Sequence, residues 1–211
     1  MIEVYYGVPS IFGRKVLAVL EEKGLDYEIK KLSLAAKDHL KDEYIKLNPN
    51  GEIPTLVDDG SVIYESTAII EYLNDEYIEP ALLPEDSFGR AKVLMVEDFC
   101  DLHLFPPVVK CFIKSVLKGE ALTDEDKKPV AEGFKRIDTY LGKQEYVAGK
   151  FSLADCAVMP AMASAEGLGF LDLAECSAHM KKYIQRLKAH NGYKGANMFK
   201  IDEPAEAEAK A

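Results

Sequence analysis

Residues 48–66 read NPNGEIPTLVDDGSVIYES, and this stretch carries the pattern that decides the fold. The β-prone run from Thr55 to Val57 is followed by turn residues from Asp58 to Ser61 and by a second β-prone run, Val62 to Tyr64. Two such runs around a short turn predict a β-hairpin. The residues after Ser66 place apolar side chains at helical spacing, so we expect Ser66 to cap a helix.

Glu65 and Ser66 together are suited to an amino-acid head group. A helix N-terminus offers unpaired amides and the positive end of a dipole, so a ligand carboxylate can bind beside Ser66 while Glu65 pairs with an ammonium. For this dipeptide alone, a plain capping serine next to a solvated acid is the simpler interpretation. The choice between the two depends on the rest of the chain.

The segments before residue 48 complete an α/β pattern. A short strand is predicted from Ile2 to Tyr6, and a helix follows that Ser10 precedes and Gly24 stops. A second strand is predicted from Tyr27 to Leu32, before a charged helical segment that ends near residue 48. The predicted order is therefore strand, helix, strand, helix, strand, strand, helix.

From residue 88 onward the chain shows only helical patterns. A long helix is predicted from Ser87 to Leu117, and Pro106 and Pro107 should kink it because proline cannot continue the hydrogen-bond ladder. Further helices are predicted to begin near Thr123, Ser152 and Ser177. The predicted domains are residues 1–77, a linker at 78–87, a helical domain at 88–200 and a disordered acidic tail at 201–211.

Composition argues against several classes of function. The chain has 211 residues and a formal net charge of -10, which disfavours nucleic acid as a partner because phosphate binding needs a concentrated positive surface. It has no apolar N-terminal signal and no apolar run of about 18 residues, so we expect a cytoplasmic protein with no membrane segment. Metal-ligand spacing is absent from its four cysteines, so we expect no metal and reduced, mostly buried thiols at Cys100, Cys111, Cys156 and Cys176.

The order of segments, with a proline opening the third strand, resembles the thioredoxin-like domain of cytosolic glutathione transferases. The turn from Pro9 to Phe12, the run Glu52-Ile53-Pro54 and the pair Glu65-Ser66 are similar to serine-type members such as the plant tau and phi enzymes and their bacterial relatives. Residues 149–155, GKFSLAD, resemble the buried capping box of the family's C-terminal domain. The resemblance implies an α/β thioredoxin-like domain (βαβαββα, mixed four-stranded sheet) followed by an all-α helical bundle.

The activity implied by the resemblance is that of a detoxifying homodimeric enzyme with glutathione as co-substrate. A cysteine thiol with a pKa near ~8.5 is mostly protonated at neutral pH, and the thiolate is the nucleophile. Ser10 would donate a hydrogen bond to that sulfur, and the thiolate would attack a hydrophobic electrophile bound between the domains. The alternative is that Ser10 is only a helix cap, in which case Tyr5, Tyr6 or a water would activate the sulfur.

The resemblance also implies how glutathione is held. The backbone of Ile53 would bind the cysteinyl unit, which requires a cis peptide bond before Pro54. The glycyl carboxylate would be bound by Lys37, His39 or Lys41, although residues of this kind are more often solvated surface charges than ligands. Glu52 departs from the family pattern of Gln or Lys, and an acid there would repel the peptide unless it faced solvent. The predicted glutathione-binding residues are His39, Lys41, Glu52, Ile53, Pro54, Glu65 and Ser66.

An apolar wall for the electrophile is predicted from Ile11, Phe12, Phe105 and Val109, with Val108 and Phe112 as further candidates. Apolar side chains at helical spacing are more often part of an ordinary core. Two alternatives to conjugation stay open. One is glutathione-dependent peroxide reduction, isomerisation or dehalogenation on the same scaffold, and the other is a non-catalytic module for ligand binding or protein assembly.

Overall fold

The computed structural model describes residues 1–170 and 176–197, so the tail predicted at 201–211 lies outside the described residues. The first half of the chain contains β1 (Ile2–Tyr6), α1 (Ile11–Lys23), β2 (Tyr27–Lys31), the short 3-10 helix η1 (Asp38–Leu40), α2 (Asp42–Ile45), β3 (Thr55–Asp58), β4 (Ser61–Tyr64) and α3 (Ser66–Glu76). The second half contains α4 (Ser87–Phe99), η2 (Cys100–Leu104), α5 (Phe105–Phe112), η3 (Ile113–Leu117), α6 (Asp124–Leu141), α7 (Leu153–Gly167), α8 (Ala178–Ala189) and α9 (Gly192–Ala196).

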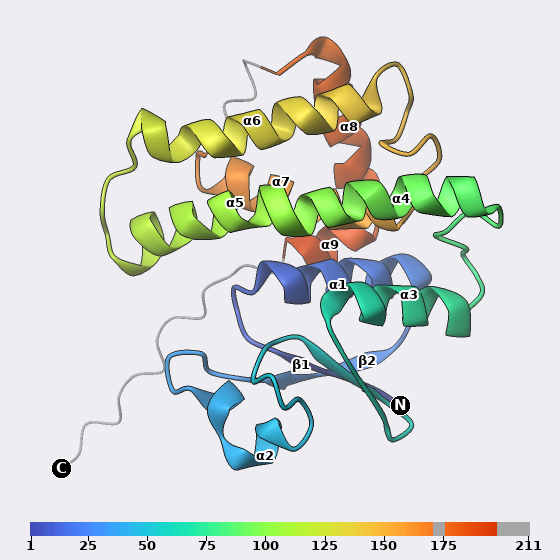
Figure 1. Ribbon diagram of the computed structural model, residues 1–211, viewed down its shortest axis with the longest axis vertical. Coiled ribbons are helices and arrows are strands. Elements are labelled where there is room, and N and C mark those ends of the chain that lie inside the picture. The colour runs from blue at the N-terminus through green and yellow to red at the C-terminus, as the bar shows by residue number, and fades with distance from the viewer. Residues whose placement is uncertain (171–175, 198–211) are drawn as a thin grey trace.

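The four strands form one mixed sheet in the order β2-β1-β3-β4. Strand β1 runs parallel to β2 and antiparallel to β3, and β3 pairs with β4 as the predicted hairpin. Helices α1 and α3 cover one face of the sheet, and α2 lies on the other side (Figure 1). The predicted βαβαββα order and mixed four-stranded sheet are therefore confirmed.

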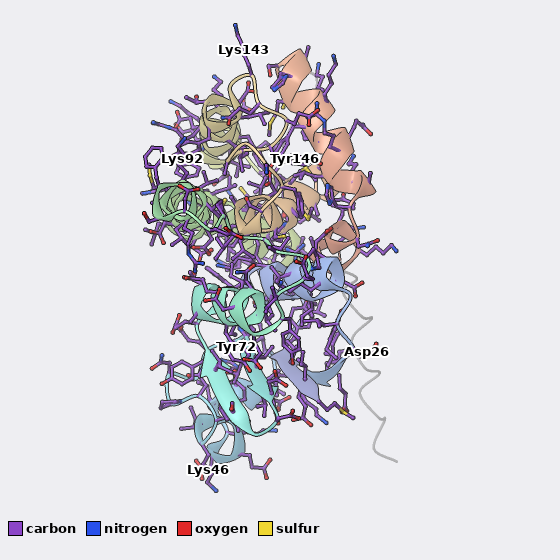
Figure 2. All side chains as sticks on the ribbon, turned by 90° about the vertical axis from the view of Figure 1, so that its right-hand side faces the viewer. Asp26, Lys46, Tyr72, Lys92, Lys143 and Tyr146 are labelled. Atoms are coloured by element: carbon purple, nitrogen blue, oxygen red, sulfur yellow. The ribbon has the colours of Figure 1, made fainter. Side chains whose placement is uncertain are left out.

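Helix α1 lies between the sheet and the helical half of the molecule (Figure 1). Its residues Val16 to Leu20 are completely buried, because one side packs on α3 and the strands while the other packs on α7 and α9. Figure 2 shows side chains filling the space between the two halves, with Lys46 and Lys143 near opposite ends of the molecule. Helix α7 is buried on all sides from residue 153 to residue 165, as expected of an apolar helix at the centre of a bundle.

The predicted helix from Ser87 to Leu117 is one long rod built from α4, η2, α5 and η3 (Figure 1). Pro106 and Pro107 lie in the first turn of α5, directly after the wider π-helical turn η2. The wider turn accommodates the two residues that lack an N–H group, so the irregularity precedes the prolines and the rod continues through them.

In the described part of the chain no cysteine forms a disulfide, and Cys100, Cys111 and Cys156 are buried. Among residues 1–170 and 176–197, no group of side chains has the composition of a metal site. In the same residues, no helix is long and apolar enough to cross a membrane.

The capping box that begins α7 is completely buried. The Asp155 carboxylate accepts hydrogen bonds from the amides of Ser152 at 3.0 Å and Val147 at 3.2 Å, and from the Tyr183 hydroxyl at 2.8 Å. One side chain thus joins the start of α7, the loop before it and α8. The second box, at Thr123 and Asp126, lies on the surface at the start of α6.

We predict that Asp155→Ala lowers the free energy of unfolding by about 2–4 kcal/mol, because it leaves buried donors without an acceptor. Thr123→Ala removes an exposed cap and should cost about 1 kcal/mol. Denaturant unfolding of the two variants checks the difference. Equal losses would mean that burial does not raise the importance of the Asp155 contacts.

Candidate functional site

A polar cleft of about 610 Å³ lies where the loops of the sheet domain face the helical half. Six of the predicted glutathione-binding residues line it, namely His39, Glu52, Ile53, Pro54, Glu65 and Ser66. Two hydrogen bonds stabilise the loop before β3. The Asn48 side-chain amide donates to the Glu52 carbonyl at 2.8 Å, and the Tyr44 hydroxyl donates to the same oxygen.

An apolar hollow of about 260 Å³ adjoins this cleft, and Phe12 and Ile53 line both. Ser10 lines the apolar hollow, together with Ile11 and Val109, which were predicted to form its wall. Other wall residues come from the two domains: Leu34, Val108, Phe112, Ile113 and Leu117. The two spaces therefore differ in chemistry and meet near the start of α1.

Phe105 does not line the apolar hollow, although it was predicted to. Its side chain is completely buried, and its ring meets that of Phe12 edge to face with centroids 5.2 Å apart. The prediction was wrong because Phe105 starts α5 directly after the wider turn η2 and points into the bundle. Phe105 therefore packs against Phe12, which lines the hollow, without lining the hollow itself.

Ser10 is the N-cap of α1. Its Oγ accepts a hydrogen bond from the Gly13 amide at 3.1 Å, and its own amide donates to the Gly7 carbonyl at 2.8 Å. In the described part of the chain no acceptor takes the Ser10 O–H. The cap uses the oxygen as an acceptor, so the hydroxyl proton stays available to a ligand at the mouth of the helix.

The two tyrosines considered as alternatives to Ser10 line neither space. Tyr6 is almost completely buried in the sheet against Gly13, and burial raises its pKa to about 12. The pKa of Tyr5 is also raised by burial. Neither phenol is placed to act as a base at neutral pH.

Ile53 presents free backbone groups to the cleft. The Ile53–Pro54 peptide bond is cis, as expected. Among the described residues, neither the N–H nor the C=O of Ile53 pairs with another backbone group. An extended peptide can therefore pair with these backbone groups just before β3, in the manner of an added strand.

Ser66 is the first residue of α3 and does not cap it, which corrects the sequence prediction. The cap position is held by Glu65, which makes no side-chain capping bond. Glu65 has φ 70° and ψ 116°, so the chain turns sharply just before the helix, and Ser66 and Thr67, which both line the cleft, lie in the first helical turn. The Glu65 carboxylate is exposed and accepts from the Asn50 side chain at 3.2 Å.

The three cations proposed for a carboxylate are placed differently. His39 lines the cleft, and its buried Nδ1 has no hydrogen-bond partner among the described residues. Lys41 does not line it, because its ammonium pairs with Asp38 at 2.6 Å and its side chain is 63% exposed. Lys37 is exposed, with φ 58°, and lies outside the cleft too.

Thr67 and Asp101 also line the cleft, and sequence reasoning missed both. Asp101 comes from η2 in the helical half, so no local motif links it to residues 48–66. The signal that could have found it is Lys15, an ammonium within the apolar run of α1, which needs a buried acid as its partner.

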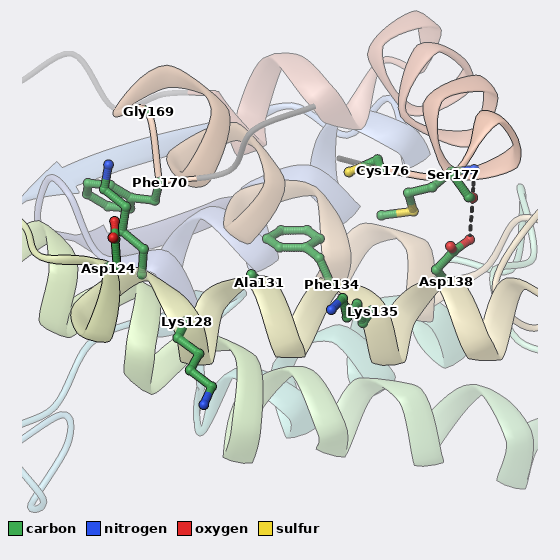
Figure 3. A pocket seen from close by; sticks show the side chains of 12 residues that line it. Asp124, Lys128, Ala131, Phe134, Lys135, Asp138, Gly169, Phe170, Cys176 and Ser177 are labelled. Carbon is green, nitrogen blue, oxygen red and sulfur yellow. Dashed lines mark hydrogen bonds between the residues drawn. The ribbon is translucent and has the colours of Figure 1, made fainter. Parts of the chain in front are cut away.

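A third hollow, of about 400 Å³, lies between α6 and the start of α8 (Figure 3). Phe134 and Phe170 contribute its apolar wall, and Ser177 donates to Asp138 at 2.9 Å across one end. Lys128 and Lys135 are exposed. None of the predicted site residues lies in it.

We predict that glycine is better tolerated than alanine at position 65. Both substitutions delete the carboxylate, but only alanine keeps the side-chain clash of a positive φ, so Glu65→Gly should exceed Glu65→Ala in unfolding free energy by about 1 kcal/mol. Denaturant titration measures the difference. The ordinary order, with alanine the more stable, would show that this backbone conformation carries no strain.

Comparison with known proteins places these features in a family. The family model for the glutathione S-transferase N-terminal domain matches residues 9–76, and the model for the C-terminal domain matches residues 99–191. Glutathione S-transferase 3 of Zea mays is 33% identical over 174 residues, which cover 76% of this chain and 78% of that protein.

Solved structures agree with this assignment. A delta-class glutathione transferase from Nilaparvata lugens is similar with a TM-score of 0.84 and 32% identity, over 94% of this chain and 96% of that one. Glutathione transferase E6 from Drosophila melanogaster has a TM-score of 0.81 and 28% identity, over 94% of each chain. On the combined ground of its two matched domains, its sequence identity and its fold, the chain belongs to the glutathione S-transferase family of enzymes.

Proposed function

We propose that this enzyme binds glutathione along the polar cleft, that Ser10 stabilises the glutathione thiolate, and that this thiolate attacks a hydrophobic electrophile in the apolar hollow. One observation supports the proposal most directly. Phe12 and Ile53 line both the polar cleft and the apolar hollow, and Ser10 lines the apolar hollow beside them. A tripeptide in the cleft would bring its central residue to this meeting point.

The reaction needs the thiolate rather than the thiol. The Ser10 O–H donates to the sulfur, and the amides and dipole at the start of α1 favour the same negative charge. Lowering the thiol pKa by ~2 units corresponds to ~2.7 kcal/mol, which makes the thiolate the majority species at pH 7. The sulfur then forms a bond to the electrophilic carbon, and the leaving group departs with its electron pair.

The two ends of glutathione would bind to different elements. The γ-glutamyl carboxylate fits the first-turn amides at Ser66 and Thr67, and the glycyl carboxylate fits His39. Ile53 would pair with the cysteinyl backbone. Glu52 is exposed, so its charge is solvated and its repulsion of the peptide is weak.

The electrophile would be apolar because the walls of its hollow are. Ile11, Phe12 and Val109 lie around Ser10, and the exposed Leu117 and partly exposed Ile113 reach in from η3. Polar side chains in the wall are few: Ser10, Arg14 and Ser164. Arg14 is engaged elsewhere, donating to the Ala196 carbonyl at 3.0 Å and to Ser164 at 2.6 Å.

We predict that Ser10→Ala lowers kcat/KM for conjugation at pH 7 by about 20- to 30-fold, because the thiol pKa returns toward ~8.5 and the thiolate fraction falls accordingly. Activity should recover as pH rises through that value. Ultraviolet titration of the bound thiol should show the same shift. Ser10→Thr keeps the hydroxyl and should retain most of the activity.

The control for Ser10→Ala is stability, since the cap is lost as well. A loss of about 1 kcal/mol is expected and leaves the enzyme folded. Turnover that survives this substitution would mean that another group activates the sulfur. Retention of the unmodified chain on immobilised glutathione without any conjugation would instead support the non-catalytic module.

We also propose that the enzyme is a homodimer joined along the rod of α4 and η2. Phe88, Met95 and Leu102 recur at intervals of seven and form one exposed apolar stripe, with exposures of 70%, 61% and 67%. Val62 and Tyr64 of β4 are also exposed apolar residues.

The double variant Met95→Lys with Leu102→Lys should therefore sediment as a monomer, because two charges would be buried without partners. Leu40→Lys, a change at a 53% exposed leucine in η1, is the matched control and should leave the dimer intact. A double variant that sediments like the unmodified chain would exclude this face.

A further inference from the structure

The third hollow, between α6 and the start of α8, is separate from both spaces of the proposed reaction. Its volume of about 400 Å³ lies within the range of about 300–1,000 Å³ that is typical of small-molecule pockets. Among the described residues, none that lines it also lines the polar cleft or the apolar hollow. Conjugation therefore assigns no role to this hollow.

One face of α6 gives the third hollow an ordered pattern of charge. The lining residues Asp124, Lys127, Ala131, Lys135 and Asp138 follow one another at intervals of three or four, so they lie along the same side of the helix. Figure 3 shows Asp124 and Asp138 towards opposite ends of the hollow, with Ala131 between them. The two lysines thus flank a small residue in the middle, and the two acids lie at the ends.

The acids and the lysines of this face differ in how they are stabilised. Asp138 accepts a hydrogen bond from the Ser177 hydroxyl at 2.9 Å, and Asp124 lies in the first turn of α6, where the helix dipole favours a negative charge. Among the described residues, neither Lys127 nor Lys135 forms an ion pair. The chain has a formal net charge of -10, so two lysines without an acid partner in one hollow run against its overall composition. The middle of the hollow is therefore positive.

The bottom of the hollow is apolar and comes from different segments. Phe134 of α6, Phe170 and Met180 of α8 line it, and their exposed fractions are only 2%, 3% and 1% because they also belong to the core. Figure 3 shows the Phe134 ring directed from α6 into the space below α8. A ligand lying here would place its body against carbon while its charged group stayed within reach of the α6 lysines.

We propose that the third hollow binds a small organic anion with an aromatic body, such as an aryl sulfonate or an aryl carboxylate, apart from the reacting molecules. Its negative charge lies between Lys127 and Lys135, and its rings rest on Phe134. The positive middle repels cations, and the acids at the two ends repel an extended polyanion. The ligand class is therefore a compact anion with one charge.

The experiment compares two fluorescent probes that share their rings. 8-Anilinonaphthalene-1-sulfonate carries a sulfonate, and N-phenyl-1-naphthylamine lacks it. At low salt the unmodified chain should bind the sulfonate about fivefold or more tightly, and added salt should reduce this preference because exposed lysines are screened. Saturating S-hexylglutathione, which the proposed function places in the polar cleft and the apolar hollow, should leave this binding in place.

Two variants of α6 separate the charge from the space. The double variant Lys127→Ala with Lys135→Ala should bring the preference for the sulfonate close to one. Ala131→Leu keeps both ammonium groups but fills the middle of the hollow, so it should weaken both probes by about tenfold. Circular dichroism and conjugation activity should match those of the unmodified chain for both variants.

The matched control is Lys46→Ala with Lys110→Ala, which removes the same charge from two exposed lysines outside the third hollow. This control should keep the full preference. An equal loss in it would overturn the proposal, because the effect would then come from net charge alone.

Three further outcomes overturn the inference. They are equal binding of the two probes by the unmodified chain, an undiminished preference in the Lys127 and Lys135 double variant, and displacement of the sulfonate by S-hexylglutathione. The comparison of the α6 variants does not depend on conjugation. An unmodified chain that neither binds nor conjugates glutathione would defeat the proposed function and leave this comparison decisive for the third hollow.

Discussion

The burial of α1 on both sides is the constraint on which the rest of this structure depends. Its sheet side requires Gly13, because a Cβ there would lie 2.4 Å from the Tyr6 ring. On its other side α9 approaches so closely that a Cβ on Gly195 would lie 2.7 Å from the backbone of Leu17. A helix held this tightly cannot rotate or slide, so the Ser10 hydroxyl at its start has a fixed position.

Several site residues occupy environments that ordinary stability would not favour. Glu65 has a positive φ, and among the described residues Ile53 leaves backbone groups without backbone partners and His39 keeps a buried ring nitrogen without a hydrogen-bond partner. Each of these features costs free energy, and the surrounding packing holds them in place. All three residues line one cleft, which is the distribution expected of a binding site.

The two spaces of the site differ because they are built from different parts of the chain. Loops and helix starts of the sheet domain supply backbone amides and carbonyls to the polar cleft, which suit a charged peptide. The apolar hollow is lined partly by α5 and η3 of the helical half. In the proposed function, substitutions in α5 and η3 would therefore change the electrophile that fits while leaving the peptide cleft intact.

The sequence by itself determined the features that arise from short-range patterns. The hairpin of residues 55–64, the caps at Ser10, Thr123 and Ser152 and the order of the elements all follow from turn chemistry and periodicity within a few residues. The tertiary structure alone decided what depends on distant partners. Phe105 faces the core, Lys41 pairs away from the cleft, and Asp101 meets Lys15 across 86 positions, because burial and charge pairing join segments that no local pattern connects. The tertiary structure also decided the position of Ser66 in its helix. Glu65, with its positive φ, occupies the cap position, so Ser66 is the first helical residue and not the cap.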